Sequence, residues 1–439
     1  MKRAASQTAA VNAEYSPIAS LTAFTSLQTP THHTASATTS TMTHYVAPAL
    51  CAAVFGGWIY GYNLGITSGL TTSLISHTYF PEADPTTQSL YQGVLTSSIL
   101  MGGMLGSFGG AAISDASGRQ TALLLTGVID LCAAVLQSLW TFSFLGLVLT
   151  RTMLGLAVGM AGVCVPQYVS EVTHGSKYSG KFGVCFQIAI CATILLAQGL
   201  NLAFNPDGSD EIANWVWQVQ LALGAIPGAI LALLCMLQII PESPMYAGKL
   251  DESEVQQRQQ LTNGSDSDSS EWDIQNTSGH NSAAASPTAR GTAHYVRVDA
   301  NSNEQPQDSS RDQKTGWKQM MSRGGMQHMG VALILAAASQ LTGINIIILY
   351  APSIFSEAAP SVNPLLLTLV CVGVWNLLSV FLSFALVDKL GRKVLMLGAL
   401  SAMFAAEVLM GLAYSAFSDQ KSALAIAAII IFVGAYETG

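Results

Sequence analysis

Long apolar stretches without a charged residue recur along most of the chain. Examples are residues 46–81, 131–150, 182–206 and 324–356. A helix needs about 20 mostly apolar residues to cross a bilayer, and helices of soluble domains are usually shorter. The pattern therefore predicts ten membrane-spanning helices, near 46–69, 90–112, 121–143, 145–168, 182–204, 215–239, 328–355, 364–387, 394–414 and 422–439.

Two hydrophilic segments, residues 1–45 and 241–327, divide this pattern into parts. Both are rich in Ser, Thr, Asn, Gln and Gly and cannot bury a core. We expect a disordered cytosolic tail over 1–45, with an organelle transit peptide as the alternative reading. We also expect a six-helix bundle over 46–240, a largely disordered cytosolic loop over 241–327 that is open to cytosolic partners, and four helices over 328–439.

Composition supports an all-α membrane protein. The chain has 439 residues, of which 50% are hydrophobic and 10% charged, against about 25% charged residues in soluble domains. Its net charge of −8 argues against nucleic-acid binding. The seven cysteines lie in apolar runs, as small hydrophobic residues do, so we expect no disulfide framework, metal site or cofactor. No pattern typical of an enzyme's catalytic residues is present.

Basic residues predict the orientation. With the N-terminus inside, sixteen of the 18 Lys and Arg residues fall in inner segments, Lys421 falls in an outer loop and Arg151 falls in a span. This excess follows the positive-inside rule. Asp130 and Glu407 are acids within predicted spans, and the sequence does not identify their partners.

One internal repeat relates the two bundles. Asp115, Gly118 and Arg119 follow the second span, and Asp388, Gly391 and Arg392 follow the eighth with the same spacing. Glycine permits a sharp turn, and the charged side chains can clamp neighbouring helix ends. The offset of six helices predicts two homologous halves, the second of which shows only four helices. The fold is therefore expected to be truncated.

Several spans carry uncharged polar side chains. Amides donate and accept hydrogen bonds, which suits a neutral polyhydroxyl ligand. We expect local unwinding at Gly343, which would bring the polar groups on either side of it to one cavity. The candidate ligand-binding residues are Gln187, Gln340, Asn345, Tyr350 and Asn376.

These segments resemble the sugar porters of the major facilitator superfamily, from about Val46 to Gly439 without most of 250–315. The resemblance is carried by Gly61-Tyr-Asn63-Leu-Gly65, both Asp-x-x-Gly-Arg loops, Arg151-x-x-x-Gly155, Pro166 to Glu171, Pro241-Glu242-Ser-Pro244, and Gln340-Leu-Thr-Gly343-Ile-Asn345 with Tyr350. The sequence around Gly343 also resembles that of protozoan hexose transporters.

The resemblance implies a hexose site between the halves, with hydrogen bonds from Gln187, Gln340, Asn345 and Asn376. It also implies an inner latch that holds one conformation. The latch residues would be Asp115, Gly118, Arg119, Glu171, Glu242, Asp388, Gly391, Arg392 and Glu437.

The residue at position 63 predicts the transport mode. Proton-coupled relatives carry Asp there, but Asn63 cannot titrate. We therefore expect facilitative uniport of a hexose such as glucose, in the plasma membrane or alternatively an organelle membrane. The alternatives are a proton-coupled sugar or polyol transporter, and a non-transporting sugar sensor or partial gene product.

Departures from the family pattern motivate the sensor alternative. Ser339 replaces a usual glutamine, and Ser179, Val216 and Met245 replace usual arginines, so we expect a weaker latch. The Gly/Pro-rich segment and the two helices that follow in the family would come after Gly439.

Overall fold

The computed structural model describes residues 35–140, 142–174, 179–207, 213–248, 323–415 and 421–439, and every regular element among them is a helix. Most of the expected tail and inter-half loop, at 1–34 and 249–322, lies outside these residues. Helix α1 begins at Ala35, within the segment that we assigned to the tail.

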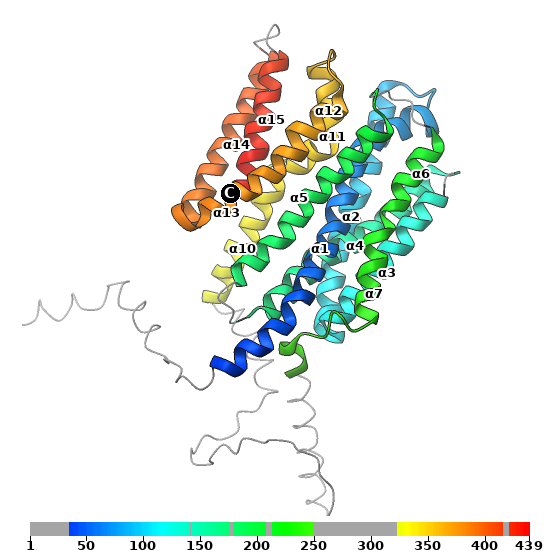
Figure 1. The fold of residues 1–439 in the computed structure, drawn as a ribbon. Coiled ribbons are helices and arrows are strands. Elements are labelled where there is room, and N and C mark those ends of the chain that lie inside the picture. The colour runs from blue at the N-terminus through cyan, green and yellow to red at the C-terminus, as the bar shows by residue number, and fades with distance from the viewer. Residues whose placement is uncertain (1–34, 141, 175–178, 208–212, 249–322, 416–420) are drawn as a thin grey trace, which may run out of the picture.

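The first half is a bundle of long helices (Figure 1). The helices α2 and α4, α1 and α5, and α3 and α7 pack in pairs. Small residues allow these close contacts, as at Gly102, where an added Cβ would lie 2.0 Å from the Thr152 carbonyl oxygen. The elements are α1 (Ala35–Ser73), η1 (Leu74–Tyr79), α2 (Pro85–Ser117), α3 (Arg119–Leu139), α4 (Phe144–Val172), α5 (Ser179–Phe204), α6 (Asn214–Leu223) and α7 (Ala225–Met236).

The second half lies beside α5 (Figure 1). Its helices contact the first half through α11 on α1 and through η2 and α13 on α5. The direct contacts between the halves are therefore made mainly by α1 and α5 of the first half. The elements are α10 (Arg323–Leu341), α11 (Ile344–Ala358), α12 (Pro364–Thr368), η2 (Leu369–Val374), α13 (Trp375–Leu390), α14 (Arg392–Ser415) and α15 (Lys421–Thr438).

Nine helices among the described residues are long and apolar enough to cross a membrane. They match nine of the ten predicted spans. The tenth predicted span, 328–355, is divided into two helices, because α10 ends at Leu341 and α11 begins at Ile344. Gly343 lies between them with a left-handed φ of 84°, a conformation that a residue without Cβ adopts readily. The expected unwinding is thus present.

The two repeated loops share a backbone conformation. Gly118 joins α2 to α3 with φ 95°, and Gly391 joins α13 to α14 with φ 78°. Both are positions where other residues are strained. The repeat seen in the sequence is thus also a repeat of local structure.

Candidate functional site

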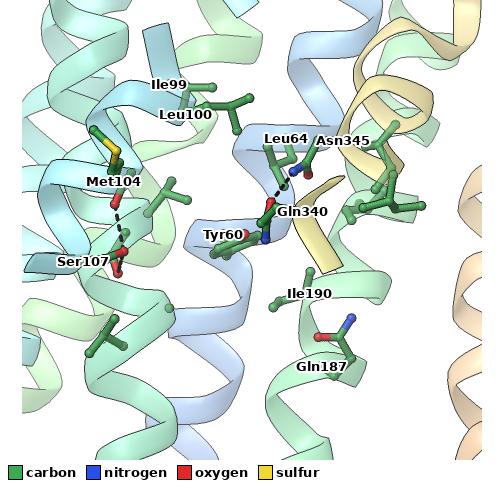
Figure 2. Close-up of a pocket in the computed structure, with 18 of the residues that line it drawn as sticks. Tyr60, Leu64, Ile99, Leu100, Met104, Ser107, Gln187, Ile190, Gln340 and Asn345 are labelled. Atoms are coloured by element: carbon green, nitrogen blue, oxygen red, sulfur yellow. Dashed lines mark hydrogen bonds between the residues drawn. The ribbon is translucent and has the colours of Figure 1, made fainter. Parts of the chain in front are cut away.

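A cavity of about 680 Å³ opens between the two halves (Figure 2). Residues of α1, α2, α4 and α5 line it from the first half, and residues of α10, α11 and α15 line it from the second. Its size lies within the range of small-molecule sites, and its wall is largely apolar with a few polar groups, as in such sites. The polar side chains in the lining are Tyr60, Ser107, Gln187, Gln340, Asn345, Tyr436 and Glu437.

Three of the five candidate ligand-binding residues line this cavity, namely Gln187, Gln340 and Asn345. Figure 2 shows Gln340 and Asn345 pointing toward each other. The Asn345 Nδ2 donates to the Gln340 Oε1 at 2.9 Å. Although they are five residues apart, the break at Gly343 brings both side chains to one place.

The other two candidates lie behind the lining. Asn376 on α13 is fully buried, and its Nδ2 donates to the Glu437 Oε1 at 2.9 Å. Tyr350 is partly buried and packs against the hydrophobic core. Neither is among the residues that line the cavity.

The structure differs from the prediction at Glu437, which we assigned to the inner latch. Its carboxylate lines the cavity instead and accepts from Gln187 Nε2 at 3.2 Å, Asn376 Nδ2 at 2.9 Å and Cys191 Sγ at 3.8 Å. The reason is helix length. Glu437 lies 16 residues beyond Lys421 in α15, a rise of about 24 Å, whereas the hydrocarbon core is about 30 Å thick.

The remaining first-half latch residues do form one cluster. Arg119 is nearly buried and forms a forked contact with Glu171, with Nε 3.0 Å from each carboxylate oxygen and Nη2 2.8 Å from Oε1. Its Nη1 lies 3.2 Å from the Asp115 Oδ1. Paired hydrogen bonds of this kind orient an arginine as well as binding it.

Glu242 completes the cluster from beyond α7. Its Oε1 accepts the backbone N–H of Arg119 at 2.8 Å, and its two oxygens accept that of Gln120 at 3.3 and 3.2 Å. These are free N–H groups at the start of α3, where a negative charge is favourable. Ser243 Oγ donates to Glu171 Oε2 at 2.6 Å and joins the two acids. In the second half, Gly391 is described, but the side chains of Asp388 and Arg392 lie outside the described residues.

Sequence reasoning missed part of the polar structure. Tyr60, Ser107 and Tyr436 line the cavity but were not candidates. Asn63 was a candidate for transport mode alone, yet its Nδ2 donates to the Asp130 Oδ1 at 3.3 Å. The only sequence signal for this contact was Asp130 itself, a lone acid within an apolar span.

Comparison with known proteins decides the family. The family model described as "Sugar (and other) transporter" matches residues 49–439. The chain belongs to this family of transporters. It is 28% identical over 423 residues to sugar transport protein MST6 of Oryza sativa subsp. japonica, covering 91% of this chain and 72% of that protein. It is 27% identical over 385 residues to the D-xylose transporter of Levilactobacillus brevis, covering 87% and 74%.

Solved structures show the same fold for this sugar transporter. The partially occluded inward-open xylose transporter XylE of E. coli matches with a TM-score of 0.64 and 22% identity, covering 90% of this chain and 84% of that one. The proton:xylose symporter XylE bound to 6-bromo-6-deoxy-D-glucose matches with a TM-score of 0.66 and 21% identity, covering 90% and 80%. The chain is thus a multi-pass membrane protein of the major facilitator fold, as predicted.

Proposed function

We propose that this chain carries a neutral hexose such as glucose across the plasma membrane by alternating access. The observation that carries the proposal is the cavity between the halves, with Gln187 from the first half and Gln340 and Asn345 from the second. Because both halves contribute residues to one cavity, a bound ligand contacts both, and movement of one half against the other changes these contacts.

The chemistry of the lining favours an uncharged, hydroxyl-rich solute. Amides both donate to and accept from hydroxyl groups, and the described residues of the lining include no Lys or Arg that would attract an anion. Its acid, Glu437, already accepts hydrogen bonds from two amides. Apolar residues of α2 and α4, such as Ile99 and Val158, supply the face against which a sugar ring can pack.

The cluster around Arg119 supports the conformational part of the proposal. It ties the ends of α2, α3 and α4 to the segment after α7, and the Arg119 and Glu171 side chains in it are largely shielded from solvent. Such charged contacts are worth most where water is excluded. The first half therefore has an inner end that can move as one body.

The surroundings of Asn63 bear on the transport mode. Uniport was expected because Asn63 cannot titrate, and it stays a prediction. The neighbouring carboxyl of Asp130 favours the alternative of proton coupling, which is developed below.

A flux assay tests the proposal. The full chain is reconstituted in proteoliposomes loaded with unlabelled D-glucose, and entry of radiolabelled D-glucose is followed. We expect saturable entry that unlabelled D-glucose competes and L-glucose does not. Competition by D-xylose and mannitol then tests a pentose or polyol as substrate.

Two outcomes would contradict hexose transport. Saturable binding of D-glucose without flux would make the chain a sensor. If none of these solutes is bound or transported, the cavity is not a sugar-recognition site.

A further inference from the structure

The fully buried carboxyl group of Asp130 lies beside α1, one of the helices that line the cavity. Asp130 on α3 has 0% exposed surface, and its Oδ1 accepts from Asn63 Nδ2 on α1. The same turn of α1 presents Tyr60 and Leu64 to the cavity. One helix therefore contacts both the cavity and the acid, so a movement of α1 on ligand binding changes the surroundings of both.

Close backbone packing seals the other side of this carboxyl group. At Gly228 of α7, an added Cβ would lie 2.5 Å from the Asp130 Oδ2, and at Gly127 of α3 it would lie 2.6 Å from the Gly228 carbonyl oxygen. The Oδ2 atom has no hydrogen bond of ordinary geometry among the described residues. The carboxyl group is therefore in close contact with the backbone of α7.

The helices around Asp130 provide few compensating charges. Neither α6 nor α7 contains Asp, Glu, Lys or Arg, and α1 contains only His44 as a basic residue. The acids Asp115 on α2 and Glu171 on α4 pair with Arg119, which lies 11 residues before Asp130 on α3, about 16 Å along the helix. Other titratable groups on these helices include Tyr62, Tyr91, Cys164, Tyr168 and Cys235.

Arg151 on α4 is a buried cation whose hydrogen bonds reach the same residue of α1, Asn63, through its backbone carbonyl. Its Nη1 donates to Thr67 Oγ1 at 2.5 Å, and Thr67 Oγ1 donates to the Asn63 carbonyl oxygen. Asn63 in turn donates to Asp130. Arg151 is fully buried, and its Nε and Nη2 atoms have no partner among the described residues. A buried acid without an ion pair and an incompletely paired buried base thus both contact the same turn of α1.

We propose that Asp130 is a proton-binding site that couples sugar movement to the proton gradient; this rests on the proposed sugar transport. Burying an isolated carboxylate is unfavourable, so the group is stable as the neutral acid while α1, α3 and α7 are in contact. When α1 moves and water reaches Asp130, the O–H bond breaks and the proton passes to that water. The Asn63 Nδ2 donor then stabilises the anion until a proton binds from the other side.

The proposed proton site lies on α3, not at position 63 on α1, from which the transport mode was predicted. Asn63 supplies the amide, and Asp130 supplies the carboxyl group 67 residues later on another helix. A non-titrating residue at 63 therefore does not exclude proton coupling in this chain.

The test uses accumulation of sugar in proteoliposomes of the full chain. Labelled D-glucose is measured inside at steady state, with and without an inward proton gradient. With one proton per sugar, a gradient of one pH unit supports about tenfold accumulation, because one pH unit is tenfold in proton concentration. Uniport gives equal concentrations on both sides. Exchange of labelled for unlabelled sugar is measured in parallel without a gradient.

We expect the wild type to accumulate sugar. Asp130→Asn should lose accumulation, with sugar exchange still detectable. The double variant Asn63→Asp/Asp130→Asn, in which the two side chains are swapped, should accumulate sugar again. Glu407→Gln, which removes an exposed acid on α14, should accumulate sugar as the wild type does.

Three results would overturn the proposal. They are equal concentrations in the wild type despite active exchange, full accumulation by Asp130→Asn, and a double variant that exchanges sugar but does not accumulate it. If Asp130→Asn fails to fold, accumulation by the double variant still tests whether a carboxyl group at this contact couples sugar to protons. Absence of exchange in the wild type would instead refute sugar transport itself.

Discussion

Asn345 donates its side-chain amide to Gln340 across the helix break at Gly343, with Nδ2 and Oε1 2.9 Å apart. The break allows this contact, because residues five apart on a continuous helix do not share a face. Both side chains line the cavity. The pair is therefore a small preformed unit that offers a donor and an acceptor to a ligand.

Removal of either member of this pair should weaken sugar binding. We expect Gln340→Ala and Asn345→Ala each to raise KM about tenfold, since a lost hydrogen bond and an unpaired neighbour together cost about 1–3 kcal/mol. Initial rates of D-glucose exchange measure this effect. Because the two residues touch, the double variant should lose less than the sum of the single losses. Ser401→Ala, on an exposed face of α14, is the control, and an unchanged KM in both variants would remove the pair from the sugar site.

Glu437 should control both the packing of the halves and the rate of transport. Glu437→Ala leaves the Gln187 and Asn376 amides without their acceptor, at about 1–3 kcal/mol for each group that stays buried and unpaired. Glu437→Gln keeps one acceptor oxygen and should lose less. We expect the Ala variant to lower kcat/KM more than tenfold and to lower Tm in detergent. Equal values for wild type and Ala would show that the carboxylate is dispensable, with Glu407→Gln as the matched control.

Gly118 should tolerate no side chain. Its φ is 95°, and an added Cβ would lie 2.2 Å from the Glu242 Oε2 that caps α3. We expect Gly118→Ala to destabilise the protein by about 1–2 kcal/mol from backbone strain alone, and by more because Glu242 is displaced. Gly391 has φ 78°, but no atom of the described residues lies within 4 Å of a Cβ added there, so the loss for Gly391→Ala should be smaller.

Gly93→Ala is the control for these two variants, because it adds a Cβ in open space within α2. It should be neutral or slightly stabilising, since alanine favours helix. Thermal unfolding in detergent measures all three. A Tm for Gly118→Ala equal to that for Gly93→Ala would contradict the strain argument.

The Arg119 cluster should act on rate rather than on sugar affinity. Arg119→Lys keeps the charge but loses the forked contact with Glu171, and Glu171→Gln removes the negative partner. Breaking a buried charged pair costs about 3–5 kcal/mol, although part of this cost is shared by both conformations. We expect kcat for exchange to fall about tenfold with KM little changed. A rise in KM at constant kcat would place the effect in the cavity instead.

The sequence by itself determined the membrane class, nine of the ten spans and the family. These depend on local properties: the length of each apolar run, the basic residues between runs, and motifs such as Asp-x-x-Gly-Arg. Gly343 also marked the unwinding, because the conformational freedom of glycine is a property of the residue itself. Gln187, Gln340 and Asn345 could be selected as cavity residues because a polar group in a membrane span is costly and requires a partner.

Only the tertiary structure decided the partners of these groups. Glu437 looked like a latch acid at a helix end, but the depth it reaches along α15 brings it to Gln187 and Asn376, on helices from both halves. Asn63 appeared isolated until α3 placed Asp130 against it, 67 residues away. Helix periodicity shows that a residue is buried, but which helix lies opposite depends on packing of all the helices together. For this reason, residue 63 alone was not enough to infer the transport mode.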